Sequence, residues 1–242
     1  MSSTPAEPCT KASAKADEKA EVQAYFNSTG FERWNRIYSE SDDVNKVQRN
    51  IRLGHQKTVD QVLAWLQEEG DLATRSFCDA GCGVGSLSLP LAALGAGSIQ
   101  ASDLSEAMVM EARRRAEAAG IEVNRLQVST SDLESLGGSY DTVICLDVFI
   151  HYPQEPAEQM VGHLASLATQ KLIVSFAPYT PLLAALKRLG DFFPGPSKAT
   201  RAYTLREEGI VAAAERAGFR PQRRSLNKAP FYFSRLIEFE RI

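Results

Sequence analysis

The chain has 242 residues, a length that suits one large domain or one domain with a small lid. Its hydrophobic content of 44% and its charged content of 24% are ordinary for a soluble globular protein. A net charge of −3 argues against a strongly basic surface, so we expect no nucleic-acid partner. No apolar run approaches the about 18 residues that cross a bilayer, so we expect no membrane span.

The first 19 residues, MSSTPAEPCTKASAKADEK, are small, polar and charged. They lack the apolar core of a signal peptide and contain no Arg, unlike an organellar transit peptide. We therefore expect residues 1–19 to form a disordered tail. The four cysteines of the chain show neither a disulfide framework nor zinc-binding spacing, which favours a reducing cytoplasm and no protein-bound metal.

Residues 20–70 place apolar side chains at helical spacings, which predicts a helical flap near the N-terminus. Gly30 and Gly54 are expected to mark bends between helices, and Gly70 is expected to end the last of them.

The segment from Tyr25 to Tyr38, YFNSTGFERWNRIY, is unusually rich in aromatic side chains. One interpretation is packing, and the spacing of Phe31 and Trp34 predicts core positions for both on one helix face. The other interpretation is a site for a flat aromatic ligand, because aromatic rings stack on one another. Tyr38 ends the segment beside polar residues, so we expect its hydroxyl to reach the ligand pocket.

From residue 71 to residue 177, short apolar segments alternate with helical patterns. Five segments have the character of buried strands: SFCDAG, SIQASDL, EVNRLQVST, YDTVICLDV and KLIVSFAP. Strands that alternate with helices indicate a parallel sheet with helices on both faces.

The alternation pauses at residues 178–203, which we expect to form an inserted lid. A helix beginning at Thr204 follows, and two closely spaced strand patterns, RPQRRSLN and FYFSRLIEFER, then predict an antiparallel pair. Residues 71–177 and 204–242 are thus predicted to form an α/β core. Its sheet has seven strands and is mostly parallel, with an antiparallel last strand.

The run FCDAGCGVGS carries the clearest chemical motif. Asp79 lies near the end of a predicted strand, and Gly81, Gly83 and Gly85 follow. Glycines let the backbone turn sharply and approach a ligand closely before the next helix begins. The GxGxG spacing differs from the GxGxxG of dinucleotide-binding domains, although such a loop alone is a weak signal.

Three further acids lie at predicted strand ends. Asp103 ends the second strand, where a carboxylate is placed to accept both hydroxyls of a ribose. Asp132 follows the third strand and either meets an adenine amino group or caps a turn. Asp147 ends the fourth strand, and His151 lies on the next loop, at the edge where open α/β sheets bind ligands. His151 either faces a substrate or braces this loop.

The DxGCGxG loop, the acid that ends the second strand and the Asp after the third resemble the class I S-adenosylmethionine-dependent methyltransferase superfamily. The resemblance covers residues 75–242 and implies a Rossmann-like fold with S-adenosylmethionine as the cosubstrate. It also implies that the loop carrying His151 adjoins the transferable methyl group. The implied cofactor-binding residues are Asp79, Gly81, Cys82, Gly83, Asp103, Leu104, Asp132, Leu133 and Asp147.

The runs YFN, GFERWNRIY, VNKVQRNIRLGH, DAGCGVGSL and FIHYP together resemble the magnesium-protoporphyrin IX O-methyltransferase family over nearly the whole chain. This resemblance implies methyl transfer from S-adenosylmethionine to a propionate carboxylate of Mg-protoporphyrin IX, giving the monomethyl ester, in chlorophyll biosynthesis. It implies that Tyr38 and His151 position the carboxylate. It also implies the large porphyrin-binding subunit of magnesium chelatase as a partner, and peripheral contact with photosynthetic membranes.

The implied reaction fits the types of residue present. A propionate has a pKa of about 4.3, so it is ionised at pH 7 and needs no general base. The enzyme must instead align oxygen, methyl and sulfur, which in favourable systems is worth about 7–11 kcal/mol. The ordinary pKa of a histidine, about 6.5, also permits a charged His151 that offsets the anion.

Other functions share parts of this pattern. A methyltransferase acting on a quinone precursor would keep the glycine loop but lack the GFERWNRIY run. A catalytically silent S-adenosylmethionine-binding scaffold and a dinucleotide oxidoreductase are further alternatives. Methylation of Mg-protoporphyrin separates all three from the function that the family resemblance implies.

Overall fold

The computed structural model describes residues 23–25, 27–37, 44–180 and 203–242. Within these ranges, seven strands form one sheet in the order β3-β2-β1-β4-β5-β7-β6. The strands are β1 (Ser76–Ala80), β2 (Ser98–Asp103), β3 (Leu126–Thr130), β4 (Tyr140–Cys145), β5 (Ala168–Phe176), β6 (Phe219–Ala229) and β7 (Tyr232–Arg241).

The strand directions match the predicted sheet. The first five strands pair in parallel, and β1 lies between β2 and β4. β7 is antiparallel to both of its neighbours: its Arg235 lies opposite Phe176 of β5, and its Tyr232 lies opposite Ala229 of β6. The expectation of a mostly parallel seven-stranded sheet with an antiparallel end is therefore confirmed.

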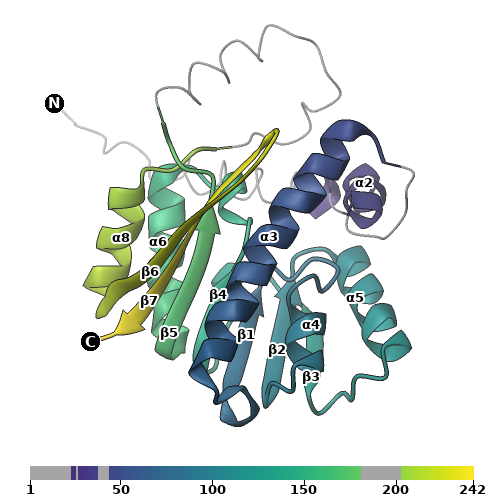
Figure 1. Ribbon diagram of the computed structural model, residues 1–242, viewed down its shortest axis with the longest axis horizontal. Helices are drawn as coiled ribbons and strands as arrows, with labels where there is room; N and C mark the ends of the chain where they lie inside the picture. The colour runs from purple at the N-terminus through teal and green to yellow at the C-terminus, as the bar shows by residue number, and fades with distance from the viewer. Residues whose placement is uncertain (1–22, 26, 38–43, 181–202) are drawn as a thin grey trace, which may run out of the picture.

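Helices cover both faces of this sheet (Figure 1). α3, α4 and α5 pack on one face, and α6 and α8 pack on the other. None of the helices in the described ranges combines the length and the apolar character that crossing a bilayer requires. The helices are α2 (Thr29–Ile37), α3 (Lys46–Glu69), α4 (Ser88–Ala93), α5 (Glu106–Ala118), α6 (Gln154–Leu167) and α8 (Glu207–Arg216), with short 3-10 turns η1 (Leu72–Thr74), η2 (Leu133–Ser135) and η3 (Phe149–His151).

The alternation of side chains along the central strands divides the core into two layers. On β1, Phe77 packs toward α3 and α4, whereas its neighbour Cys78 packs toward α6. Phe149, Phe176 and Phe239 are fully buried on the α6 side. Each such ring contributes about 1.5–3 kcal/mol through burial, so the core holds the carboxyl edge of the sheet firmly in place.

α3 is one continuous helix of 24 residues. Asn45 and Gln48 form a capping box at its start, and Gly70 ends it in the left-handed conformation with φ 74°. The predicted end at Gly70 is confirmed, but the predicted bend at Gly54 is wrong. Gly54 instead makes room for a neighbouring ring, because a Cβ there would lie 2.2 Å from Cδ1 of Tyr232.

Two other local predictions also need correction. α8 begins at Glu207 rather than at Thr204, because Leu205 is held in an isolated parallel bridge with Pro178. Gly30 does not mark a bend but is the second residue of α2, where it contacts Tyr25.

In the aromatic segment, Phe31 and Trp34 are partly buried rather than fully buried. Tyr38, the tail at residues 1–19 and most of the predicted lid, residues 181–202, lie outside the described residues. The boundaries of the tail, the flap and the lid therefore stay predictions.

A cluster of charges joins the end of α3 to the amino ends of the parallel strands. Glu69 pairs with Arg75 at 2.6 Å and also with Lys171 of β5. The fully buried Glu238 of β7 is 2.9 Å from Arg223 and 3.4 Å from Lys171. This cluster, called the basal charge cluster below, anchors α3 at the edge of the sheet opposite to the candidate site.

Candidate active site

The predicted site residues come together at the carboxyl edge of the parallel strands. β1 pairs with β2 on one side and with β4 on the other, so successive connections leave β1 in opposite directions. Open α/β sheets bind ligands at such a topological switch point. The glycine loop after β1, Asp103 at the end of β2 and the turn after β4 all border this point.

The glycine loop has the backbone that only glycine adopts easily. Gly81, Gly83 and Gly85 have φ values of 83°, 54° and 86°. The N–H groups of Gly81 and Cys82 both donate to the carbonyl oxygen of Ser102 at 2.8 Å, which ties the loop to β2. A Cβ added at Gly83 would meet nothing within 4 Å, so the backbone there is open to a ligand.

Asp103 connects this loop to the start of α5. Its Oδ2 accepts the N–H of Gly83 and its Oδ1 accepts the N–H of Ser105, each at 2.9 Å. Backbone N–H groups engage both oxygens, and a carboxylate with about four lone-pair sites keeps acceptor capacity for a ribose. Burial raises the pKa of Asp103, and the backbone donors oppose that rise.

Asp79 lies deeper than the other acids of this edge. Only 2% of the residue is exposed, and its Oδ2 accepts the hydroxyl of Ser88 at the start of α4. Burial raises the pKa of Asp79 to about 6, and the charge of Asp103 adds to the rise. The observed role is to join β1 to α4, and a contact of Asp79 with a cofactor stays a prediction.

Asp132 caps the η2 turn, as one of its two interpretations predicted. Its Oδ1 accepts the N–H of Ser135 at 2.7 Å. Leu133, the next residue, is buried against the α6 side of the core. Cys82 in the glycine loop is also buried, and burial raises the pKa of its thiol. Contacts of these three residues with a cofactor stay predictions.

The side chain of Asp147 is surrounded by donors that sequence reasoning did not foresee. Its Oδ2 accepts hydrogen bonds from Tyr232 at 2.6 Å and from Nδ1 of His55 at 2.8 Å. Its Oδ1 accepts hydrogen bonds from Ser175 at 2.8 Å and from Ser234 at 3.0 Å. These bonds lower the pKa of Asp147 despite the opposing effect of burial, so the carboxylate is ionised. A cofactor contact through this side chain stays a prediction.

His151 ends the η3 turn four residues after Asp147. The N–H of Tyr203 donates to the carbonyl oxygen of Ile150 at 2.7 Å and so ties this turn to the chain beyond residue 202. Burial lowers the pKa of His151 to about 4, so the imidazole is neutral at pH 7. The charged His151 that the sequence permitted is therefore not the form that the fold favours.

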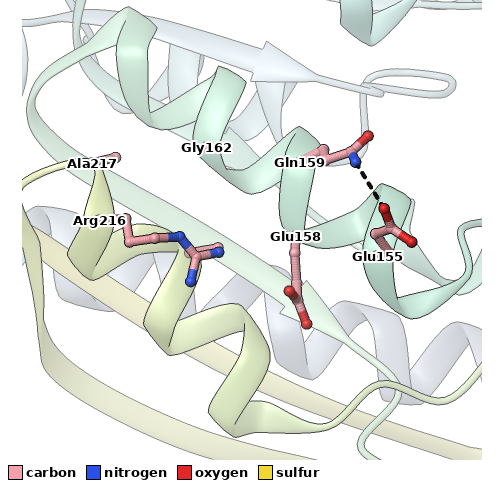
Figure 2. A pocket seen from close by; sticks show the side chains of 7 residues that line it. Glu155, Glu158, Gln159, Gly162, Arg216 and Ala217 are labelled. Carbon is pink, nitrogen blue, oxygen red and sulfur yellow. Dashed lines mark hydrogen bonds between the residues drawn. The ribbon is translucent and has the colours of Figure 1, made fainter.

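The described residues also form a shallow cavity of about 440 Å³ between α6 and α8. Figure 2 shows that Glu158 and Arg216 face each other across it from the two helices. None of the predicted site residues lines this cavity, so we do not assign it to the active site. Across the described ranges, no group of three or more His, Cys, Asp or Glu side chains is placed to hold a metal ion.

Comparisons with known proteins agree with this geometry. A family model described as the C-terminus of magnesium-protoporphyrin IX methyltransferase matches residues 145–241. A magnesium-protoporphyrin O-methyltransferase from Synechocystis is 53% identical over 225 residues, which cover 93% of this chain and 97% of the relative. The chain belongs to the magnesium-protoporphyrin IX methyltransferase family.

A second relative, a crystal structure and a general domain model are also similar to this chain. The chloroplastic magnesium protoporphyrin IX methyltransferase of Arabidopsis thaliana is 54% identical, covering 91% of this chain and 70% of the relative. The crystal structure of the Synechocystis PCC 6803 enzyme with bound SAH superposes with a TM-score of 0.86 at 51% identity, covering 93% of this chain and all of that chain. A general methyltransferase-domain model matches residues 77–170, which include the glycine loop. The class I methyltransferase fold expected for this family member is therefore confirmed.

Proposed function

We propose that the chain transfers a methyl group from S-adenosylmethionine to a propionate carboxylate of Mg-protoporphyrin IX, a step of chlorophyll biosynthesis. The products are the monomethyl ester and S-adenosylhomocysteine. The observation that carries this proposal is the 53% identity to the Synechocystis enzyme across 93% of the chain. A quinone-precursor methyltransferase or a dinucleotide oxidoreductase would not be expected to match over that length.

The carboxyl edge of the sheet fits S-adenosylmethionine. The open backbone at Gly83 supports close approach of the methionine portion, beside Gly81 and Cys82. The Asp103 carboxylate, at the end of β2, is placed to accept the ribose hydroxyls, with Leu104 beside it. Further along the same edge, Asp132 and Leu133 frame the adenine.

The chain's own residues have little proton chemistry to perform. S-adenosylmethionine supplies, when bound, a methyl group on a positively charged sulfur. The porphyrin propionate is already ionised at pH 7, since its pKa is about 4.3. A neutral His151 can donate one N–H to a carboxylate oxygen, and the Tyr38 hydroxyl can donate a second hydrogen bond. These two side chains orient the carboxylate, and neither removes a proton.

Desolvation of the site helps the same step. The carboxylate and the sulfonium partly neutralise each other as the methyl group moves, so a pocket that excludes water favours the reaction. Magnesium arrives as part of the porphyrin substrate, and we assign no protein ligands to it.

The test is direct. The protein is incubated with Mg-protoporphyrin IX and methyl-labelled S-adenosylmethionine, and the porphyrin is then examined for label that alkali removes. Base-labile label on the porphyrin is the expected result, because a methyl ester hydrolyses in alkali. Binding of both compounds without any transfer of label to the porphyrin would overturn the proposal.

Two further associations belong to this proposal because the family resemblance implies them. The large porphyrin-binding subunit of magnesium chelatase hands the substrate to this protein, and the protein contacts photosynthetic membranes at their surface. Co-purification with that subunit in the presence of porphyrin tests the first association. Co-sedimentation with vesicles of thylakoid lipids, with and without porphyrin, tests the second.

A further inference from the structure

A polar cluster joins three distant parts of the chain beneath the candidate site. His55 comes from α3, Asp147 follows β4, and Tyr232 begins β7. The Tyr232 hydroxyl lies 2.6 Å from Oδ2 of Asp147, and Nδ1 of His55 lies 2.8 Å from the same oxygen. The Tyr232 hydroxyl is also 2.9 Å from that of Thr58, one turn further along α3. The ring of Tyr232 fits against the bare backbone of Gly54.

The backbone at Asp147 needs such support. Asp147 has φ 58°, one of two positive values among non-glycine residues of the described chain. This left-handed conformation costs free energy in any residue with a side chain, and it persists where surrounding contacts determine it. Besides the four side-chain donors to its carboxylate, the N–H of Asp147 donates to Ser175 at 2.8 Å. The cluster therefore fixes the direction in which the chain leaves β4.

The turn at Asp147 leads to His151, which the proposed function places beside the substrate carboxylate. Val148, the next residue, lies against Gly81 of the glycine loop, since a Cβ on Gly81 would come within 2.3 Å of it. Phe149, Ile150 and His151 then form the η3 turn. A rotation at Asp147 would move His151 relative to the glycine loop.

We propose that Asp147, held by His55 and Tyr232, is a positioning residue that sets the place of His151 in the methyl-transfer step. This inference rests on the proposed function. It assigns to Tyr232 and His55 a role in turnover although neither touches the reacting atoms. The coupling runs from α3 and β7 through the Asp147 carboxylate to the η3 turn that carries His151.

The cluster should affect turnover more than cofactor binding. The glycine loop is tied to β2 by its own bonds to Ser102 and Asp103, and none of these involves Asp147. A change in the turn after β4 should therefore leave the glycine loop and Asp103 in place. A misplacement of about 1 Å at a reacting group can lower the rate by about 100-fold.

The decisive variant is Tyr232→Phe, which removes one hydroxyl and keeps the ring against Gly54. We expect kcat to fall by about 10- to 100-fold. The dissociation constant of S-adenosylhomocysteine, measured by calorimetry, should change by no more than about twofold. Tyr140→Phe is the matched control: its hydroxyl donates to the Gly137 carbonyl at the other end of β4, and its loss should leave kcat unchanged.

A second readout does not depend on methyl transfer. The chain has 3 histidines, so the side-chain ¹H–¹⁵N signals of each can be assigned by substitution. Tyr232→Phe should shift the signals of His55 and His151 and leave those of His163 on α6 unchanged. Ser234→Ala, which removes one donor to the other oxygen of Asp147, should give the same pattern with smaller shifts.

Unchanged His151 signals in both variants would overturn the inference. So would a loss of S-adenosylhomocysteine affinity equal to the loss of kcat. Failure of the wild-type protein to methylate Mg-protoporphyrin would instead overturn the proposed function. The histidine signals would still report whether Tyr232 controls the position of His151, so the two failures are distinguishable.

Discussion

Two buried ionisable side chains at the carboxyl edge have pKa values displaced in opposite directions. Burial raises the pKa of Asp79 from 3.8 to about 6 and lowers that of His151 from 6.5 to about 4. In both cases the low-dielectric surroundings favour the neutral form. The site therefore keeps His151 uncharged at pH 7, whereas Asp79 is ionised there at a cost to stability.

The cost at Asp79 can be measured as a function of pH. Because the folded state binds the Asp79 proton more tightly, the stabilisation is present at low pH and is lost as pH rises through about 6. Relative to Asp79→Asn, the wild-type protein should lose about 2 kcal/mol of unfolding free energy between pH 4.5 and pH 7, measured by urea denaturation.

Asp141→Asn is the control for this pH series. Asp141 has a pKa lowered by its bonds to Ser76, so it is ionised in the folded and the unfolded state across the same range. The difference in unfolding free energy between the wild-type protein and Asp141→Asn should be the same at pH 4.5 and at pH 7. An Asp79→Asn difference that is the same at both pH values would contradict the assigned shift.

His151 gives a prediction for turnover. His151→Ala removes a hydrogen-bond donor from the carboxylate, so kcat should fall by about 100-fold, while S-adenosylmethionine affinity stays nearly unchanged. His151→Gln keeps an N–H donor and should recover part of the rate. Because the pKa of His151 is about 4, this group should add no pH dependence to kcat between pH 6 and pH 8. Equal losses of kcat and of affinity would remove His151 from this role.

The sequence reveals site residues that belong to a local pattern, but not those whose partners lie far away along the chain. The sequence predicts that Asp103 and Gly83 lie at the carboxyl edge because strand ends and glycine spacing are local patterns. The partners of Asp147 were missed because His55 and Tyr232 lie 92 and 85 positions away from it. Only the packing of α3 and β7 on the sheet brings them together, and a single sequence carries no signal of that contact.

At the scale of elements, one prediction about α3 is confirmed and another is wrong. Its helical spacing and its end at Gly70 are visible in the sequence, because capping is decided within a few residues. The bend predicted at Gly54 is wrong because glycine has two uses: it breaks helices, and it allows close approach by a neighbour. The neighbour here is Tyr232, far along the chain.

Gly54→Ala distinguishes these two uses. Alanine favours a helix by up to about 1 kcal/mol, but its Cβ would lie 2.2 Å from Tyr232 Cδ1. We expect a net loss of about 1–3 kcal/mol in unfolding free energy, measured by urea denaturation. Gly162→Ala is the matched control within α6, where an added Cβ meets nothing within 4 Å and should stabilise the protein. Stabilisation by both substitutions would show that Gly54 only lowers helix propensity and is not needed to make room for Tyr232.

On the scale of the whole molecule, α3 is held at two places along its length. In its first half His55 bonds to Asp147 at the carboxyl edge, and at its end Glu69 enters the basal charge cluster. In Figure 1, α3 crosses the face of the sheet between these two edges. The two anchors have separate consequences, because one adjoins the reacting groups and the other does not.

Lys171→Met tests the second anchor. It removes one of the two cations that face the fully buried Glu238, so we expect a loss of about 3 kcal/mol in unfolding free energy. Methyl transfer per folded molecule should be unchanged. The double variant Lys171→Met/Glu238→Met should recover much of the stability, because well-packed apolar side chains can replace a buried pair. A fall in kcat without unfolding would contradict the separation of the two anchors.

The fold as a whole was predictable because strand and helix patterns alternate along most of the chain. The antiparallel end of the sheet followed from the short gap between the last two strand patterns. The order of the strands, and hence the meeting of β1 and β4 at the site, was not predicted, because no local pattern specifies which strands pair.

The buried thiols of Cys78, Cys82 and Cys145 provide internal reporters of this architecture. Burial raises the pKa of Cys78 to about 12, so the reactive thiolate is scarce while the domain stays closed. In a Cys9→Ser background, iodoacetamide should modify these thiols only when the sheet opens. At high reagent concentration the labelling rate then equals the rate of opening. A ligand bound over the glycine loop should lower the labelling rate of Cys82 more than that of Cys78 or Cys145, as measured by mass spectrometry of the labelled peptides.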